Sequence, residues 1–287
     1  MNRPVADFDE RLHTLVLAAL AEDLGPGDQS TLAVIPADLR GKAILKIKQD
    51  GILAGVEIAE KIFQLREPGT IFQILKKDGE PMVSGDTAFT VEASVHTILT
   101  CERLVLNCMQ RMSGIATLTH QYVEKISGFN SRILDTRKTT PGFRLLEKEA
   151  VCIGGGMNHR FGLFDMIMLK DNHIDYCGGI GKALDNAYVY AQRYNPELKI
   201  EVEARTLDHV RAVLANGKAN RIMLDNFNPE QLKQALEIIQ HKIETEASGG
   251  INLDNIREYA ATGVDFISIG ALIHQARSVD LSLKAVE

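Results

Sequence analysis

Positively charged side chains are concentrated in three short stretches of the chain. The stretch DTRKTTPGFR, residues 135 to 144, contains Arg137 and Lys138, GGGMNHRFG contains His159 and Arg160, and MLKDNH contains Lys170. The whole chain carries a formal charge of -6, so these cations do not belong to a generally basic surface. Guanidinium groups bind carboxylates and phosphates through paired hydrogen bonds, and an ammonium adds a compact charge. The three stretches therefore predict a pocket for a ligand with several anionic groups.

Two acidic residues and two glycine-containing turns complete the candidate site. Glu203 and Asp225 end consecutive strand-like segments, a spacing that suits a divalent cation such as Mg²⁺ or the hydroxyls of a sugar. The run ASGGI precedes a helix that we expect to start near Asn252, whose N–H groups and dipole would favour a phosphate. The residues expected around that phosphate are Ser248, Gly249, Gly250, Ser268 and Gly270.

A regular alternation of strands and helices must position these residues. From about residue 131 onward the strand-like segments are RIL near 132, MIML at 166, KIEVEA at 199, RIML at 221, KIETEAS at 242 and VDFISI at 264. The last four recur roughly every 22 residues with helical patterns between them, which is typical of parallel βα units in a barrel or an open doubly wound sheet. Each segment ends in polar residues or glycine, and the carboxyl ends of parallel strands share one face. We therefore expect the six ends to form one site.

The first hundred residues have a different pattern of predicted strands and helices. Short β-like runs such as KAILKIK and TAFTVEA surround an apparent helix at GVEIAEKIFQL, which predicts a small α+β domain. A long helix is expected to begin after Ser94 and to link the two halves. The tail DLSLKAVE alternates like a strand and is predicted to return to the first domain. The charged run RLLEKEA, which includes Glu147, Lys148 and Glu149, is interpreted as a solvated helical face, and Glu201 as a structural residue.

Composition excludes several classes of function. The 287 residues are 45% hydrophobic and 24% charged, as in a globular protein, and the acidic balance argues against a nucleic-acid binder. No apolar run reaches the length of a membrane span, and the acidic N-terminus does not resemble a signal peptide. The four cysteines show no CxxC pairing and are interpreted as reduced thiols. We expect a cytoplasmic protein without a nucleic-acid or membrane partner.

Long motifs in this sequence resemble one enzyme family. The runs ERLVLNCMQRMSGIAT, DTRKTTPGFRLLEKEAVCIGGGMNHRFGLFD, LKDNHI, EVE, LDN, EASGGI and GVDFISIGAL occur in this order and resemble quinolinate phosphoribosyltransferase, also called nicotinate-nucleotide diphosphorylase (carboxylating). The resemblance spans nearly the whole chain. It implies an α/β fold with an N-terminal α/β sandwich at 1–113, joined by the tail 275–287, and an incomplete α/β barrel at 114–274.

The resemblance also implies a reaction and a role for each residue. Quinolinate and 5-phosphoribosyl 1-diphosphate would give nicotinate mononucleotide, diphosphate and CO₂, with Mg²⁺, in NAD biosynthesis. The enzyme would be a homodimer with shared active sites. The groups implied to bind quinolinate and diphosphate are Arg137, Lys138, His159, Arg160 and Lys170, with Thr136 among them and Arg103 supplied by the other subunit. Mg²⁺ or the ribose hydroxyls would be held by Glu203 and Asp225, which with Lys138 and Lys170 form the expected catalytic set.

Three alternatives remain open from the residues alone. A class I aldolase-like barrel could use Lys170 as a Schiff-base amine, since neighbouring cations lower the pKa of a lysine. A phosphoribosyltransferase for another aromatic acid would have the same donor site. A non-catalytic anion sensor is the third, although Glu203 and Asp225 would repel simple anions in the absence of a metal.

Overall fold

The computed structural model describes residues 3–286 and is a mixed α/β fold with two compact units. The first unit contains the chain up to His120, Thr139–Gly155 and the segment from Leu272 onward, and the second contains Gln121–Lys138 and Gly156–Ala271. The predicted boundary after residue 113 falls inside a helix, α4 (Val95–Lys125), which continues from one unit into the other. Within residues 3–286, no helix has both the length and the apolar character that crossing a membrane requires.

An antiparallel sheet forms the centre of the first unit. Its strand order is β12-β1-β5-β3, with bounds β12 Leu281–Val286, β1 Arg40–Ile47, β5 Thr87–Ser94 and β3 Ile71–Ile74. The tail thus pairs with β1, Leu283 lying opposite Leu45. A separate two-stranded pair is formed by β2 (Gly51–Ile52) and β4 (Pro81–Met82). The helices of this unit besides α4 are α1 (Phe8–Leu24), α2 (Gln29–Val34), α3 (Val56–Arg66) and α5 (Arg144–Ile153).

Aromatic packing joins α3 to the antiparallel sheet. The ring of Phe63 on α3 lies 6.1 Å from Phe72 of β3 and 6.4 Å from Phe89 of β5, and the latter two rings are 4.4 Å apart. Ser94 ends β5 and its hydroxyl accepts a hydrogen bond from the N–H of Thr97, which confirms the predicted start of α4. This cap and the apolar spacing of the helix make a long α4 favourable.

The charged helix α5 is buried, so the interpretation of RLLEKEA as a solvated face was wrong. Glu147, Lys148 and Glu149 are each at most 1% exposed. Glu147 accepts hydrogen bonds from Arg111 of α4, at 2.9 and 3.0 Å, and from the N–H of Thr140 at 2.8 Å. Glu149 pairs with Arg3. Arg111 also donates to the carbonyls of Ile273 and Ala276, so one guanidinium ties α4, α5 and the tail together.

Replacing Arg111 with alanine should destabilise the protein strongly. The change leaves the buried Glu147 carboxylate without its charge partner, a loss that costs about 3–5 kcal/mol for buried pairs. We expect the urea midpoint of unfolding, followed by circular dichroism, to fall accordingly. Arg211→Ala is the matched control, because Arg211 forms an exposed pair with Asp208 and its loss should cost no more than about 0.5 kcal/mol. Equal midpoints for the two variants would contradict a structural role for Arg111.

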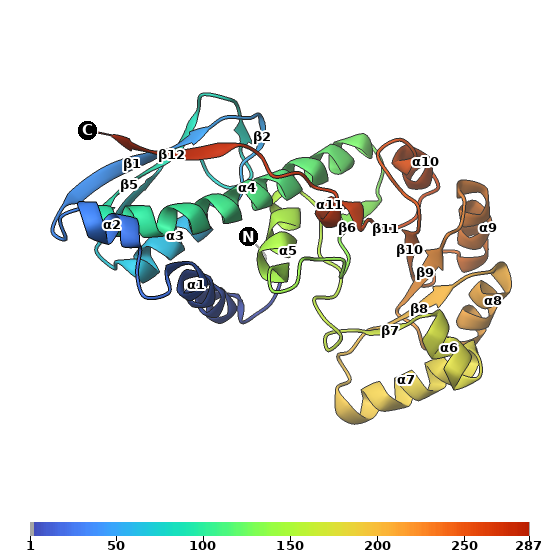
Figure 1. Ribbon diagram of the computed structural model, residues 1–287. Coiled ribbons are helices and arrows are strands. Elements are labelled where there is room, and N and C mark those ends of the chain that lie inside the picture. The colour runs from blue at the N-terminus through green and yellow to red at the C-terminus, as the bar shows by residue number, and fades with distance from the viewer. Residues whose placement is uncertain (1–2, 287) are drawn as a thin grey trace. The chain divides into compact units, whose positions relative to one another are not determined.

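A six-stranded parallel sheet forms the second unit, and all six predicted strands are confirmed. In spatial order they are β6 (Arg132–Leu134), β11 (Phe266–Ser268), β10 (Glu244–Ser248), β9 (Arg221–Asp225), β8 (Ile200–Ala204) and β7 (Ile167–Leu169). The helices that follow them are α6 (Asp171–Cys177), α7 (Ile180–Tyr194), α8 (Leu207–Asn216), α9 (Pro229–Ile239), α10 (Ile256–Ala260) and α11 (Ala271–His274). Figure 1 shows α7, α8 and α9 side by side along the outer side of the strands.

Local signals start these helices directly after the strand ends. The Thr206 hydroxyl accepts the N–H of His209 at the start of α8, and Asn228 and Gln231 form a capping box on either side of Pro229 at the start of α9. These two caps begin α8 and α9 a few residues after the ends of β8 and β9. The polar residues at the carboxyl ends are therefore held on one edge of the sheet.

Candidate active site

One cavity of about 680 Å³ lies at the carboxyl ends of the parallel strands. This volume is typical of a site for small molecules. Five of the six strand ends contribute to it, namely Thr136, Arg137 and Lys138 after β6, Lys170 after β7, Asp225 and Asn226 at β9, Ser248, Gly249 and Gly250 at β10, and Ser268, Ile269 and Gly270 at β11. His159 and Arg160 also line it. The prediction that the six strand ends form one pocket is confirmed for five of them, and the end of β8 is the exception.

Glu203, from the remaining strand, is not a lining residue of this cavity, but it contacts Lys170, which is. The Lys170 ammonium is 3.3 Å from Oε2 of Glu203, whose side chain is only 8% exposed. Glu203 alternates with Glu201 along β8, so both side chains leave the same face of the sheet. Asp225 ends the neighbouring strand β9 and accepts a hydrogen bond from the Asn226 side chain at 2.7 Å. The two predicted acidic residues thus come from adjacent strands.

The arginines of the cavity are close enough to influence each other. Burial, followed by the positive charge of Arg137, lowers the pKa of Arg160 from its usual value. Arg160 is half-buried, and its Nη1 donates to the carbonyl of Met166 at 3.3 Å. Arginine remains protonated despite such a shift. The repulsion between the guanidinium groups would be relieved by an anion bound between them.

The glycine turn after β10 requires glycine for conformational and steric reasons. Gly249 and Gly250 have φ values of +98° and +66°, in the region that other residues rarely adopt. A side chain at Gly249 would also lie 2.2 Å from Oδ1 of Asn226. The helix expected at Asn252 begins only at Ile256, and α10 has five residues, so that part of the prediction was wrong. A phosphate at this turn would be bound by backbone N–H groups rather than by a helix dipole.

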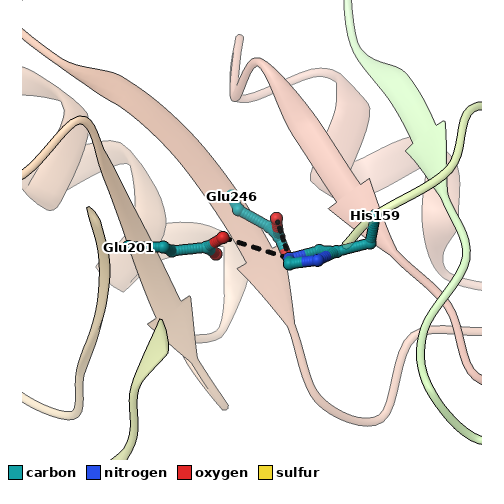
Figure 2. A group of neighbouring side chains, drawn as sticks. All are labelled: His159, Glu201 and Glu246. Atoms are coloured by element: carbon teal, nitrogen blue, oxygen red, sulfur yellow. Dashed lines mark ion pairs between the residues drawn. The ribbon is translucent and has the colours of Figure 1, made fainter. Parts of the chain in front are cut away.

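Figure 2 shows a buried ionic cluster of His159, Glu201 and Glu246. Nε2 of His159 lies 3.1 Å from Glu201 and 3.4 Å from Glu246. Burial lowers the pKa of His159, but the two carboxylates outweigh it and raise the pKa to about 9. The N–H of Arg160, 2.7 Å from Nδ1, opposes a second proton, because a protonated Nδ1 could not accept this hydrogen bond. A proton on Nε2 faces both carboxylates, and Nδ1 faces the N–H of Arg160.

Arg221 adds a positive charge to the same cluster. Its Nη1 lies 3.3 Å from Glu246 and 4.0 Å from Glu201, and its side chain is 12% exposed. The three ligand atoms of the cluster lie within 4.8 Å of one another, a separation that a metal ion could bridge. The guanidinium already compensates the carboxylates, however, and His159 engages them through a protonated nitrogen. We therefore interpret the cluster as a charge-compensated support for the His159 ring rather than as a metal site.

Models of one family match almost all of the chain. The model described as quinolinate phosphoribosyl transferase, N-terminal domain, matches residues 28–113, and the C-terminal domain model matches residues 115–284. The chain belongs to the quinolinate phosphoribosyltransferase family. The resemblance stated from the sequence motifs is thereby confirmed.

Relatives of this family are similar over nearly their full lengths. The chain is 44% identical to the nicotinate-nucleotide pyrophosphorylase [carboxylating] of Arabidopsis thaliana over 95% of this chain and 82% of the relative. It is 42% identical to the probable nicotinate-nucleotide pyrophosphorylase [carboxylating] of a Synechocystis species, over 93% and 90% of the two chains. The crystal structure of NadC from Streptococcus pyogenes superposes with a TM-score of 0.90 at 39% identity and 99% coverage of both chains.

Among the predicted site residues of the quinolinate phosphoribosyltransferase family, Arg103 and Glu203 are not among the residues lining the cavity, and within residues 3–286 Arg103 has no contact with a lining residue comparable to that of Glu203 with Lys170. Arg103 lies on α4, in the first unit, and its side chain is exposed. The role of Arg103 in a partner subunit stays a prediction.

Several cavity residues were not predicted. The apolar members are Met168, Met223 and Ile251, and the polar one is Glu246. Met223 and Glu246 are inside strands, and their alternation with Asp225 and Ser248 on the same face was the available signal. Apolar walls beside charged groups suit an aromatic ring that bears carboxylates.

Proposed function

We propose that this protein transfers the phosphoribosyl group of 5-phosphoribosyl 1-diphosphate to quinolinate and releases diphosphate and CO₂. The product would be nicotinate mononucleotide, a precursor of NAD. The observation that carries this proposal is a single cavity in which cationic side chains, apolar walls and a glycine turn occur together. Membership of the quinolinate phosphoribosyltransferase family supports it independently.

Quinolinate is a dianion, and its burial requires cations. Arg137, Lys138, Arg160 and Lys170, with Thr136 and His159 among them, would bind its two carboxylates and the adjacent diphosphate oxygens. The apolar side chains of Met168 and Met223 would pack against the pyridine ring. This arrangement would hold the ring nitrogen near C1′ of the donor, where positioning alone lowers the barrier substantially.

No side chain needs to form a covalent bond in this reaction. The ring nitrogen donates its electron pair to C1′ as the bond from C1′ to the diphosphate oxygen breaks, and Lys138 and Lys170 stabilise the departing charge. The nitrogen then carries a positive charge. The C2 carboxylate leaves as CO₂, the bonding electrons remain at C2 beside that charge, and C2 takes up a proton.

Mg²⁺ is proposed as the cofactor, with Glu203 and Asp225 as its protein ligands. Carboxylate oxygens are the ligands that Mg²⁺ prefers, and it commonly keeps waters and substrate phosphates as its other ligands. Two carboxylates on adjacent strands, one paired with Lys170, fit this description. Bound Mg²⁺ would neutralise charge on the diphosphate, and the same carboxylates could accept hydrogen bonds from the ribose hydroxyls.

The 5′-phosphate is proposed to bind at the ends of the last two strands. Ser248, Gly249 and Gly250 after β10 lie along the same cavity as Ser268 and Gly270 after β11. The glycine turn can bring backbone N–H groups close to a phosphate because no side chain intervenes.

A homodimer with shared sites is proposed, in which Arg103 reaches the partner's cavity. Its exposed side chain on α4 is available for such a contact.

We also propose a cytoplasmic location for this protein. The names of plant relatives place those proteins in chloroplasts and mitochondria.

The aldolase-like and sensor alternatives have less support. The Lys170 ammonium is held against Glu203, which suits a fixed charge better than a free amine nucleophile. A simple anion sensor has no need for the acidic pair.

The function is tested by supplying quinolinate, donor and Mg²⁺ and measuring CO₂ and nicotinate mononucleotide. We expect both products in equal amounts and their loss when the metal is chelated. Nicotinate, which lacks the C2 carboxylate, should have a kcat/KM lower by about 100-fold, because it leaves some cations of the cavity without an anionic partner. Comparable kcat/KM values for the two acids would favour a phosphoribosyltransferase of different specificity.

A further inference from the structure

Two buried glutamates beneath the cavity have no role in the reaction as proposed. Glu201 of β8 and Glu246 of β10 are both 0% exposed. Burying two carboxylates is costly unless they make strong contacts. Glu246 reaches the cavity wall, but direct contact between a carboxylate and an anionic substrate would be repulsive. The two glutamates therefore act through the neighbouring side chains that they contact.

Both glutamates hold the ring of His159, and the ring holds the next residue. Nε2 points toward Glu201 and Glu246, as Figure 2 shows, at 3.1 and 3.4 Å. On its other edge, Nδ1 accepts the backbone N–H of Arg160 at 2.7 Å. The imidazole is thus fixed from two sides, and its orientation determines where the Arg160 backbone lies.

A third carboxylate holds the backbone of the same segment. Asp135, which is 0% exposed at the end of β6, accepts the N–H of His159 at 2.9 Å and the side-chain amide of Asn158 at 2.6 Å. Residues 158–160 contain neither helix nor strand. Their position is therefore set by contacts to strands rather than by a regular hydrogen-bond pattern.

We propose that Glu201 and Glu246 are positioning residues, which fix Arg160 through His159 so that its guanidinium faces a carboxylate of quinolinate. This inference rests on the proposed function. Arg221, 3.3 Å from Glu246, compensates the buried charge and keeps the carboxylates in place. We expect the two glutamates to act mainly on quinolinate binding, because Arg160, the residue that they position, is proposed to bind a carboxylate of quinolinate.

The test is Glu246→Gln, which preserves shape and removes the charge that orients His159. We expect KM for quinolinate to rise about tenfold, equivalent to about 1.4 kcal/mol, with KM for the donor changed less than about twofold. Glu244→Gln is the matched control, because Glu244 is on the same strand and also pairs with Arg221, but is exposed. It should leave both KM values unchanged. Glu201→Gln provides a second variant if Glu246→Gln fails to fold.

A double-mutant cycle separates positioning from general destabilisation. In a His159→Ala background the link to Arg160 is absent, so adding Glu246→Gln should change KM for quinolinate by less than about twofold. Equal increases in both KM values, or a full effect of Glu246→Gln without His159, would overturn the positioning role. A wild-type protein that releases no CO₂ would overturn the proposed function and this inference with it. If the wild-type protein is active and KM for quinolinate is unchanged in both glutamine variants, the positioning role is overturned while the proposed function stands.

Discussion

Lys170→Ala is expected to lower kcat/KM for quinolinate by about 1000-fold, the loss typical of removing a group that stabilises transition-state charge. The ammonium lines the cavity and lies 3.3 Å from Glu203. Its removal takes away a positive charge near the diphosphate and also leaves a buried carboxylate without its partner. Steady-state assays of CO₂ release would measure the loss. Lys182→Ala, which changes an exposed lysine on α7, should retain wild-type activity.

The same lysine distinguishes phosphoribosyl transfer from Schiff-base chemistry. If Lys170 acts only as a charge, borohydride reduction in the presence of substrate should leave the mass of the protein unchanged. A substrate-dependent mass increase on the peptide that contains Lys170 would support the aldolase-like alternative.

The strands and their functional ends could be predicted because the relevant signals are local. Each strand of the parallel sheet is a short apolar run followed by polar residues or glycine, as at LDN for β9 and ASGG for β10. Parallel topology then brings the ends to one edge of the sheet without any knowledge of distant contacts. That is why most of the predicted cationic and glycine positions line the cavity.

Burial of charged residues could not be predicted in the same way, because their partners are distant in sequence. Glu149 of α5 pairs with Arg3, 146 positions away, and Glu147 pairs with Arg111 of α4. A charged helix has the same sequence pattern whether it faces water or buried arginines. The interpretation of Glu201 as structural fits its burial, but its contact with His159 depends on an irregular segment that the sequence pattern does not place.

The late start of α10 has a local cause: the sequence offers two asparagines as possible N-caps, and the pattern alone does not choose between them. Asn252 and Asn255 are both good N-caps. In the structure the Asn252 side chain accepts the N–H groups of Asp254 and Asn255, which forms a turn instead of the first helical residues. The helix begins after Asn255, and only the glycine turn remains beside the cavity.

Mixed dimers would test whether Arg103 acts across a subunit interface. Arg103→Ala and Lys138→Ala homodimers should each lose about 1000-fold in activity, because each removes a cation proposed to contact buried anionic groups. Arg103 is in the first unit, and Lys138 follows β6 in the second. If Arg103 serves the partner's cavity, a dimer of one Arg103→Ala and one Lys138→Ala subunit has one site with both defects and one site with neither.

The isolated mixed dimer should therefore recover about half of wild-type activity, since one of two independent sites is intact. Differently tagged subunits, co-expressed and purified through both tags, would provide it, and a mixed dimer of wild type with Lys138→Ala serves as the control. That control should also show about half activity wherever Arg103 acts, because one subunit pair still has a complete site. If Arg103 instead belongs to its own subunit's site, the dimer with two different defects remains as inactive as its parents while the control keeps its activity. A protein that is monomeric during catalysis would exclude the shared site directly.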